Sequence, residues 1–206
     1  MADDKRMPTN NDDILDLNRR ATLRCVDLVA SVRADDLQRP TPCAEWNLAD
    51  LLAHMAIQHR GFAAAASGDG EDFDWTPHPL GPHFANEYAT AAHEALKAFD
   101  DPGVLARRFV LTEIPAAPRF PGAQAISFHF IDAVVHGWDV ARSIGAEFHI
   151  PDDFAEPAIR IALAVPGGTY REHPDAAFGP VLASPEAAAP LDVVLTALGR
   201  SPSWPN

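Results

Sequence analysis

The sequence is short of basic residues and has no long apolar run. Its 206 residues include 16 Lys and Arg against 29 Asp and Glu, which gives a formal net charge of −13 at pH 7. A surface that binds nucleic-acid phosphates needs a basic face, and the anionic leaflet of a membrane would repel this chain, so we expect neither partner. No run approaches the roughly 18 apolar residues of a membrane-spanning helix, and we expect no transmembrane segment.

Cysteine is scarce as well. Cys25 and Cys43 are too few for a disulfide framework, and we interpret them as reduced thiols of a cytoplasmic protein. The polar, acidic N-terminus, Met1–Asp13, lacks the apolar segment of a signal peptide. The composition, 47% hydrophobic and 22% charged, is that of a globular chain whose core needs no disulfide or structural zinc. These features predict a single domain over residues 1–206.

Proline is abundant, and its distribution predicts where the helices run. Proline removes a backbone donor and clashes with the preceding turn, so long stretches without it are informative. Four such stretches have helical rather than alternating periodicity: 9–39, 43–76, 83–101 and 122–150. Segment 104–120 is ambiguous between an extended piece and a helical turn, and shorter helices are expected at 158–165 and 191–198. The sequence therefore predicts an all-α protein, a four-helix bundle over about residues 10–150 with a short helical C-terminal extension over about residues 151–206.

Local signals mark the ends of two of these helices. Asn47, followed three residues later by Asp50, resembles a capping box at a helix start. Gly68 is expected to close the same helix, and Gly145 to form the C-cap of the last long one.

Three polar residues lie at the edges of the predicted apolar helix faces. On the second long helix, His54 lies at the flank of the face that includes Leu51 and Phe62. On the fourth, Asp132 and His136 are four residues apart and therefore one helical turn from each other. Two ligands at this spacing, completed by a third from a facing helix, form metal sites in helical bundles.

This spacing is weak evidence by itself, because a chain with 29 acids and 9 histidines contains about one such pair by chance. His54 could instead be a core-edge histidine bonded to a backbone carbonyl, and Asp132 and His136 could form a simple helix-face hydrogen bond. An unpaired carboxylate beside a buried face is costly, however, and a divalent cation would satisfy Asp132 and both imidazoles together. The three residues therefore predict a candidate metal site.

Other polar residues have competing interpretations. His129, three residues before Asp132, could be a fourth ligand, a general base or, ranked first, a partner that orients Asp132. Asp139 is interpreted as a helix-end charge. Surface positions are expected for the remaining histidines, His59, His78, His83, His93, His149 and His173. The sequence contains no nucleophile elbow and no phosphate-binding glycine loop.

Three segments together resemble a known family. TPCAEWNLADLLAH, Thr41–His54, is similar to the start of a helix in DinB/YfiT-like proteins, in the branch of the mycothiol-dependent maleylpyruvate isomerase N-terminal domain. DAVVHGWDVARSIG, Asp132–Gly145, resembles the block of that branch in which an acid precedes His and Trp-Asp. The tail, Leu191–Trp204, is similar to the ending of its shorter actinobacterial members. The joint resemblance covers about residues 10–204.

The resemblance implies a four-helix bundle that binds a divalent metal through His54, Asp132 and His136. Zinc is expected, with nickel or iron as alternatives, because two imidazoles and one carboxylate suit all three metals. Asp132 stands where the isomerase has Glu, so its reach is one methylene shorter and its ligation is expected to be looser or mediated by water. Trp46 and Trp138, both motif positions, are expected to fix the orientation of the helices by packing.

Cys43, also a motif position, is interpreted as a small buried filler. A nucleophilic role is the minor alternative, because no cation neighbours Cys43 in the sequence.

The resemblance leaves two functions open. The first is a thiol-dependent transferase or isomerase, in which a metal-bound thiolate of mycothiol or a similar low-molecular-weight thiol attacks an electrophilic small molecule. The second is a non-catalytic metal-binding or structural bundle protein without turnover. The Asp132 exchange supports the second, as does the C-terminal domain of the isomerase, which this chain is expected to lack. A homodimer is left open, since the sequence does not determine the oligomeric state.

Overall fold

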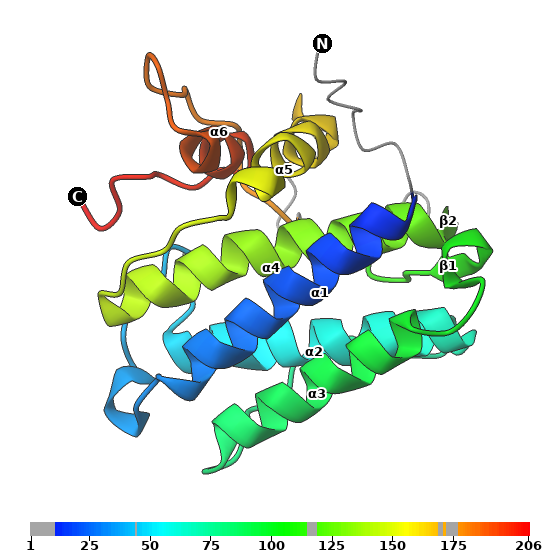
Figure 1. Cartoon of the computed structure of the whole chain (residues 1–206). Helices are drawn as coiled ribbons and strands as arrows, with labels where there is room; N and C mark the ends of the chain where they lie inside the picture. The colour runs from blue at the N-terminus through cyan, green and yellow to red at the C-terminus, as the bar shows by residue number, and fades with distance from the viewer. Residues whose placement is uncertain (1–10, 44, 115–118, 169–170, 172–176) are drawn as a thin grey trace, which may run out of the picture.

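The computed structural model describes residues 11–43, 45–114, 119–168, 171 and 177–206. Four long helices pack side by side, with α1 and α4 in one layer and α2 and α3 in the other (Figure 1). The layers contact each other through α1 against α3 and α2 against α4. The bounds of these helices are α1 Asn11–Ala30, α2 Leu48–Ser67, α3 Phe84–Phe99 and α4 Gly122–Ile144. The predicted all-α fold is confirmed, and each long helix lies within one of the proline-free stretches.

The ends of α2 and α4 follow from the local sequence. Asn47 Oδ1 accepts the backbone N–H of Asp50 at 3.0 Å, and Asp50 Oδ2 accepts that of Asn47 at 3.1 Å. This reciprocal pair is the predicted capping box, which satisfies two donors at the helix start. Gly68 ends α2 at a φ of 99°, and Gly145 ends α4 at a φ of 72°, left-handed conformations that favour glycine. Local signals thus cap α2 at both ends and α4 at its C-terminal end.

The ambiguous segment between α3 and α4 forms a short hairpin. After the 3₁₀ helix η2, Val104–Ala106, strand β1, Arg108–Val110, pairs antiparallel with β2, Arg119–Pro121. Phe109 is fully buried, and its ring stacks on that of Phe99 with 6.2 Å between the centroids. Burial of this ring against α3 stabilises the extended conformation, which no local pattern in the sequence specified.

In the C-terminal part, α5 Asp152–Ala164 packs on α4, and α6 Pro190–Ala197 packs against α5 (Figure 1). α6 agrees with the prediction to within one residue at each end. α5 begins at residue 152 rather than 158, so Pro157 lies inside the helix. Phe154 in the first turn is buried, and its ring packs against that of Phe130 of α4 with 5.3 Å between the centroids. This apolar contact offsets the hydrogen bond that Pro157 removes.

The core fills the space between the two helix layers and continues beneath the hairpin. The larger cluster joins side chains of all four long helices to residues of α5 and α6, and a second cluster surrounds Phe62, Phe99 and Phe109.

A 3₁₀ turn, η1 Ala34–Asp36, lies between α1 and α2 in the sequence. In the part of the chain that the structure describes, no helix is both long and apolar enough to cross a membrane.

Candidate metal centre

The three predicted site residues meet where α2 faces α4. One donor atom from each of His54, Asp132 and His136 lies within 4.8 Å of the other two. His136 Nε2 is 3.3 Å from Asp132 Oδ1. The rings of His54 and His136 meet edge to face, with 5.1 Å between their centroids. Adjacent turns of α4 supply the Asp and the second His, and the neighbouring helix supplies the first. The predicted spacing therefore produces one compact cluster.

The donor set of this cluster fits a divalent transition metal. Ligands about 2.0–2.1 Å from a tetrahedral ion lie roughly 3.3–3.5 Å apart, and the pair formed by His136 and Asp132 already has that separation. His54 is half-buried, and its ring nitrogens have no hydrogen-bond partner among the described residues. Two imidazoles and one carboxylate leave at least one position of a four-coordinate ion open.

His136 is held from its other side by Asp139. Its Nδ1 lies 2.9 Å from Asp139 Oδ2, and because an ionised carboxylate only accepts, Nδ1 carries the proton and donates it. Nε2 is thereby directed toward Asp132 and His54. Arg200 Nη2 donates to the same carboxylate oxygen at 3.2 Å. A carboxylate on the second nitrogen of a ligating histidine is the usual arrangement in metal proteins.

The interpretation of Asp139 as a helix-end charge is wrong. Its side chain is fully buried, and burial alone would raise its pKa. The positive charge of Arg200 and the hydrogen bond from His136 outweigh burial and hold the pKa of Asp139 below its usual value. The sequence did not indicate this pairing because Arg200 lies 61 residues further along the chain.

Cys43 is buried as predicted, but it belongs to the same polar network. Its thiol donates to Asp139 Oδ2 at 3.1 Å and accepts from Arg200 Nη2 at 3.0 Å. The cation that was absent from its sequence neighbourhood is therefore supplied by the tertiary structure. Cys43, His136 and Asp139 also form a second group with metal-ligand spacing. The guanidinium of Arg200 already provides the positive charge there, so this second group does not fit a metal.

Opposite pKa shifts distinguish the two histidines of the candidate centre. Burial lowers the pKa of His54 to about 4, and the charge of His136 adds to the effect. Burial also acts to lower the pKa of His136, but the carboxylates of Asp132 and Asp139 outweigh it and raise that pKa well above its usual value. A metal must therefore displace a proton from His136 Nε2.

Asp132 has the complementary shift. Burial acts to raise its pKa, but His136 and His54 outweigh this effect and hold the pKa of Asp132 well below its usual range. Asp132 is therefore ionised at neutral pH and provides the negative charge at the centre of the cluster.

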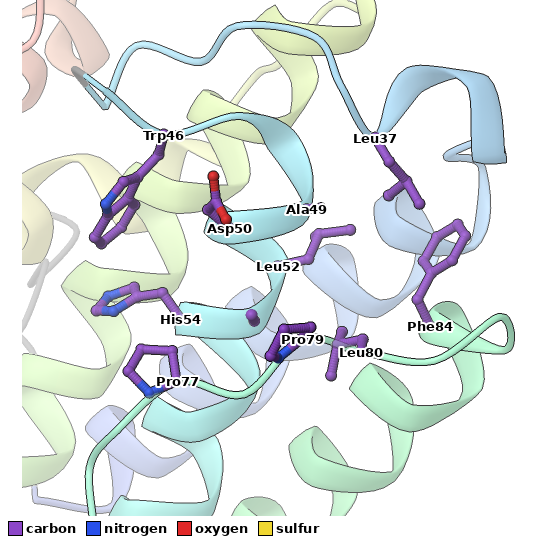
Figure 2. Close-up of a pocket in the computed structure, with 11 residues that line it drawn as sticks. Leu37, Trp46, Ala49, Asp50, Leu52, His54, Pro77, Pro79, Leu80 and Phe84 are labelled. Carbon is purple, nitrogen blue, oxygen red and sulfur yellow. The ribbon is translucent and has the colours of Figure 1, made fainter.

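A pocket opens beside the cluster on the outer side of α2. Its volume is about 400 Å³, and its lining includes His54 and Trp46 (Figure 2). The indole of Trp46 lies 4.8 Å from the His54 ring and is 36% exposed. Trp46 therefore forms a wall of the pocket in addition to packing at the start of α2. Trp138, by contrast, is buried within α4, in agreement with its predicted packing role.

His129 and His59 do not occupy their predicted positions. His129 Nε2 lies 2.9 Å from His59 Nδ1, and His129 Nδ1 lies 2.7 Å from Asn18 Oδ1. Among the described residues His129 has no hydrogen bond to Asp132, so the role of orienting that carboxylate is wrong. His59, expected at the surface, is only 3% exposed. Tyr88 of α3 covers it, with the Tyr88 hydroxyl oxygen 3.1 Å from His59 Nε2.

The other surface predictions for histidines hold where the structure describes them. Exposed positions are found for His78, His83, His93 and His149. His173 lies outside the described residues.

Glu113 is an acidic residue near the cluster that no motif indicated. It follows β1, and its Oε2 accepts a hydrogen bond from Gln58 Nε2 at 2.7 Å. Gln58 is buried one helical turn after His54, so this pair lies next to the cluster. Although the residue is exposed as a whole, desolvation of its carboxyl group raises the pKa of Glu113 to about 7; the bond from Gln58 opposes this shift, and the charge of Asp132 adds to it.

The fold and the cluster define a class, that of helical DinB-like proteins with two imidazoles and a carboxylate gathered beside a pocket. The chain belongs to the family of the mycothiol maleylpyruvate isomerase N-terminal domain, whose model matches residues 19–141. Two uncharacterized proteins from two strains of Mycobacterium tuberculosis, Rv0738 and MT0763, are each 29% identical over 194 residues, covering 92% of this chain and 98% of the relative. The resemblance identified from the sequence motifs is confirmed.

Two crystal structures of the mycothiol-dependent maleylpyruvate isomerase share the fold. The first has a TM-score of 0.64 at 16% identity and covers 98% of this chain and 93% of that chain. The second, of a mutant in which one histidine is replaced by alanine, has a TM-score of 0.60 at 14% identity and covers 92% and 81%. The first match thus spans nearly the whole length of both chains, including the part of this chain that follows α4.

Proposed function

We propose that His54, Asp132 and His136 bind one divalent metal ion, zinc in the first place, and that the protein is a thiol-dependent transferase or isomerase. The co-substrate is mycothiol or a similar low-molecular-weight thiol, and the second substrate is an electrophilic small molecule. The observation that carries this proposal is the convergence of three donor atoms within 4.8 Å beside a pocket, in a chain of this family. Nickel and iron suit the same donors.

When bound, the metal ion supplies a Lewis acid that lowers the pKa of a thiol in its open position. The residues of the chain orient this chemistry. Asp139 keeps the proton of His136 on Nδ1, so that Nε2 stays directed at the centre. Asp132 provides one negative charge, which leaves a bound divalent ion with net positive charge to attract a thiolate.

Glu113 is placed to hold the proton that the thiol releases. A carboxyl group with a pKa of about 7 can accept or return a proton near neutral pH. Gln58, one helical turn after His54, donates from its Nε2 to Glu113 Oε2 at 2.7 Å and so holds the carboxyl group.

Elemental analysis of the purified protein, combined with a thiol-consumption assay, tests the proposal. We expect close to one transition ion per chain, and we expect His54→Ala and His136→Ala to lose it together with metal-dependent thiol consumption. His93→Ala, which changes an exposed histidine of α3, is the matched control and should keep both. A protein that binds neither zinc nor nickel at micromolar concentration would contradict the metal site. Metal without thiol consumption would leave the non-catalytic bundle protein as the function.

A further inference from the structure

The pocket beside His54 has the size of a small-molecule site and a strongly apolar wall. Its volume of about 400 Å³ falls in the range of roughly 300–1,000 Å³ that is typical of ligand pockets. From the imidazole of His54 it runs along the outer side of α2 to the start of α3 (Figure 2). Most of the lining is apolar and includes Leu37, Leu52, Pro77, Pro79, Leu80 and Phe84.

The charges around this pocket have one sign. Asp50 is its only carboxylate, and no Lys or Arg of the described chain lines it. The buried cationic groups near the cluster already have carboxylate partners in the described structure: Arg200 contacts Asp139, and His136 lies between Asp132 and Asp139. A ligand that carries a carboxylate would therefore lose part of its hydration, meet Asp50 and gain no counter-charge from the wall of this pocket.

We propose that this pocket binds the apolar body of an uncharged electrophile and discriminates against carboxylated substrates. The proposal rests on the proposed function and specifies its second substrate. It separates this chain from the named activity of its structural relatives, since maleylpyruvate is an anion with two carboxylates at neutral pH. The exposed indole of Trp46 offers a planar apolar surface next to the candidate metal centre, where a flat ligand can stack.

The thiol is a poorer occupant of the same pocket. A sugar-based thiol such as mycothiol needs many hydrogen-bond partners, and this wall has few polar groups. The carboxylate of Asp50 already accepts the N–H of Asn47 in the capping box. The electrophile therefore takes the apolar pocket, and the thiol approaches His54 from outside it.

A matched pair of probes tests this charge preference. Methyl 4-chloro-3-nitrobenzoate and 4-chloro-3-nitrobenzoate differ in one negative charge. Both can react in the same way: the thiolate sulfur forms a bond to the ring carbon, the C–Cl bond breaks, and chloride leaves with the electron pair. Calorimetric titration of the full chain without thiol measures binding alone. The titration is done on the protein as purified and after chelation, because a carboxylate can also bind a metal directly.

We expect the ester to bind on the order of tenfold more tightly than the acid, or better. Ala49→Arg places a cation on α2 inside the pocket and should abolish or reverse this preference, whereas Ala49→Gln, of similar length, should keep it. Pro79→Arg, at an exposed position of the wall, is a second variant with the same expectation if Ala49→Arg does not fold. Equal or tighter binding of the acid to the chelated wild type would overturn the proposal. So would an unchanged preference in folded arginine variants.

The two proposals fail in distinguishable ways. If the ester binds preferentially but no thiol is consumed, the pocket assignment stands and the proposed function is wrong. If thiol is consumed with both probes at equal efficiency and the titrations show no preference, the proposed function stands and the charge discrimination is wrong.

Discussion

Two histidine clusters lie on neighbouring turns of the same two helices, and they differ in almost every physical property. The candidate metal centre consists of His54, Asp132 and His136. The second cluster, here called the enclosed chain, links His59 of α2 and His129 of α4 to Tyr88 and Asn18. Similar residue types, on similar turns, thus have different surroundings.

The enclosed chain consists of four side chains joined end to end by hydrogen bonds between uncharged groups. Asn18 Oδ1 can only accept, so His129 Nδ1 donates to it and His129 Nε2 is left as an acceptor. His59 Nδ1 therefore donates to His129, and His59 Nε2 accepts from the Tyr88 hydroxyl. Every ring nitrogen of the two histidines thus has a hydrogen-bond partner while both rings stay neutral. The rings of Phe62 and Phe99 flank His129, with centroid distances of 5.0 and 5.2 Å.

The comparison shows that buried histidines alone do not make a metal site. Burial lowers the pKa of both His59 and His129, the latter to about 4, whereas two carboxylates raise the pKa of His136 well above its usual value. Two features distinguish the candidate metal centre. Asp132 is ionised and its charge is not balanced by hydrogen bonds from neutral groups in the described part of the chain, and His54 is half-buried and faces a pocket. A bound cation satisfies those groups, and the enclosed chain needs none.

The largest expected effect comes from removing the charge of the candidate centre. Asp132→Asn keeps the shape of the side chain, and we expect metal affinity to fall by more than about 100-fold, beyond the loss typical of residues that only contact a ligand. His129→Gln, one turn away in the enclosed chain, should change affinity less than about threefold. Competitive chelator titration of both variants measures the difference. An Asp132→Asn protein indistinguishable from wild type would remove this residue from the site.

Asp132→Glu sharpens the same prediction. The longer side chain restores the residue that the isomerase branch has at this position, so we expect it to preserve or tighten metal binding. A large loss in the same titration would mean that the interior is packed around the shorter side chain, where an added methylene has no room.

An intermediate effect is expected from the group behind His136. Asp139→Asn leaves an acceptor for Nδ1 but removes the charge that pairs with Arg200, and we expect metal affinity to fall by about 10–100-fold. The buried guanidinium loses its partner, so thermal unfolding should also shift to lower temperature. The exposed Asp69→Asn serves as the matched control. Unchanged affinity together with lowered stability would restrict Asp139 to a structural role.

The smallest effect on metal affinity is expected from the enclosed chain, which instead makes the stability of the fold depend on pH. Its histidines have folded-state pKa values below the unfolded value of about 6.5, so the unfolded state binds protons first as the pH falls. Their contribution to stability is therefore complete above about pH 6.5 and decreases toward pH 4. His129 alone should account for up to about 3 kcal/mol of this loss.

Urea unfolding of wild type and His129→Gln at pH 7.0 and 4.5 measures this dependence. The glutamine amide can accept from His59 and donate to Asn18 without titrating, so the variant should lose less stability between the two pH values. His93→Gln, at the exposed surface of α3, should behave as wild type. Equal losses in His129→Gln and wild type would contradict the assignment.

Features that depend on residues close together in the sequence were determined by the sequence itself. Proline-free stretches with helical periodicity predicted all four long helices, and the capping pair Asn47 and Asp50 predicted where α2 begins. The spacing of Asp132 and His136 predicted that they share one helix face, because helix geometry alone sets the direction of side chains four residues apart. With His54 at the edge of another apolar face, the candidate cluster followed.

Features that depend on distant partners were decided only by the tertiary structure. Asp139 is a buried anion because Arg200 reaches it from the end of the chain, and His59 is a core residue because Tyr88 of α3 covers it. The hairpin and the early start of α5 likewise follow from burial of Phe109 and Phe154. Local periodicity gives the direction of each side chain, but whether that direction meets solvent, a carboxylate or another ring depends on which helices pack together. That packing is set by many weak apolar contacts summed over the whole core, which no single spacing in the sequence contains.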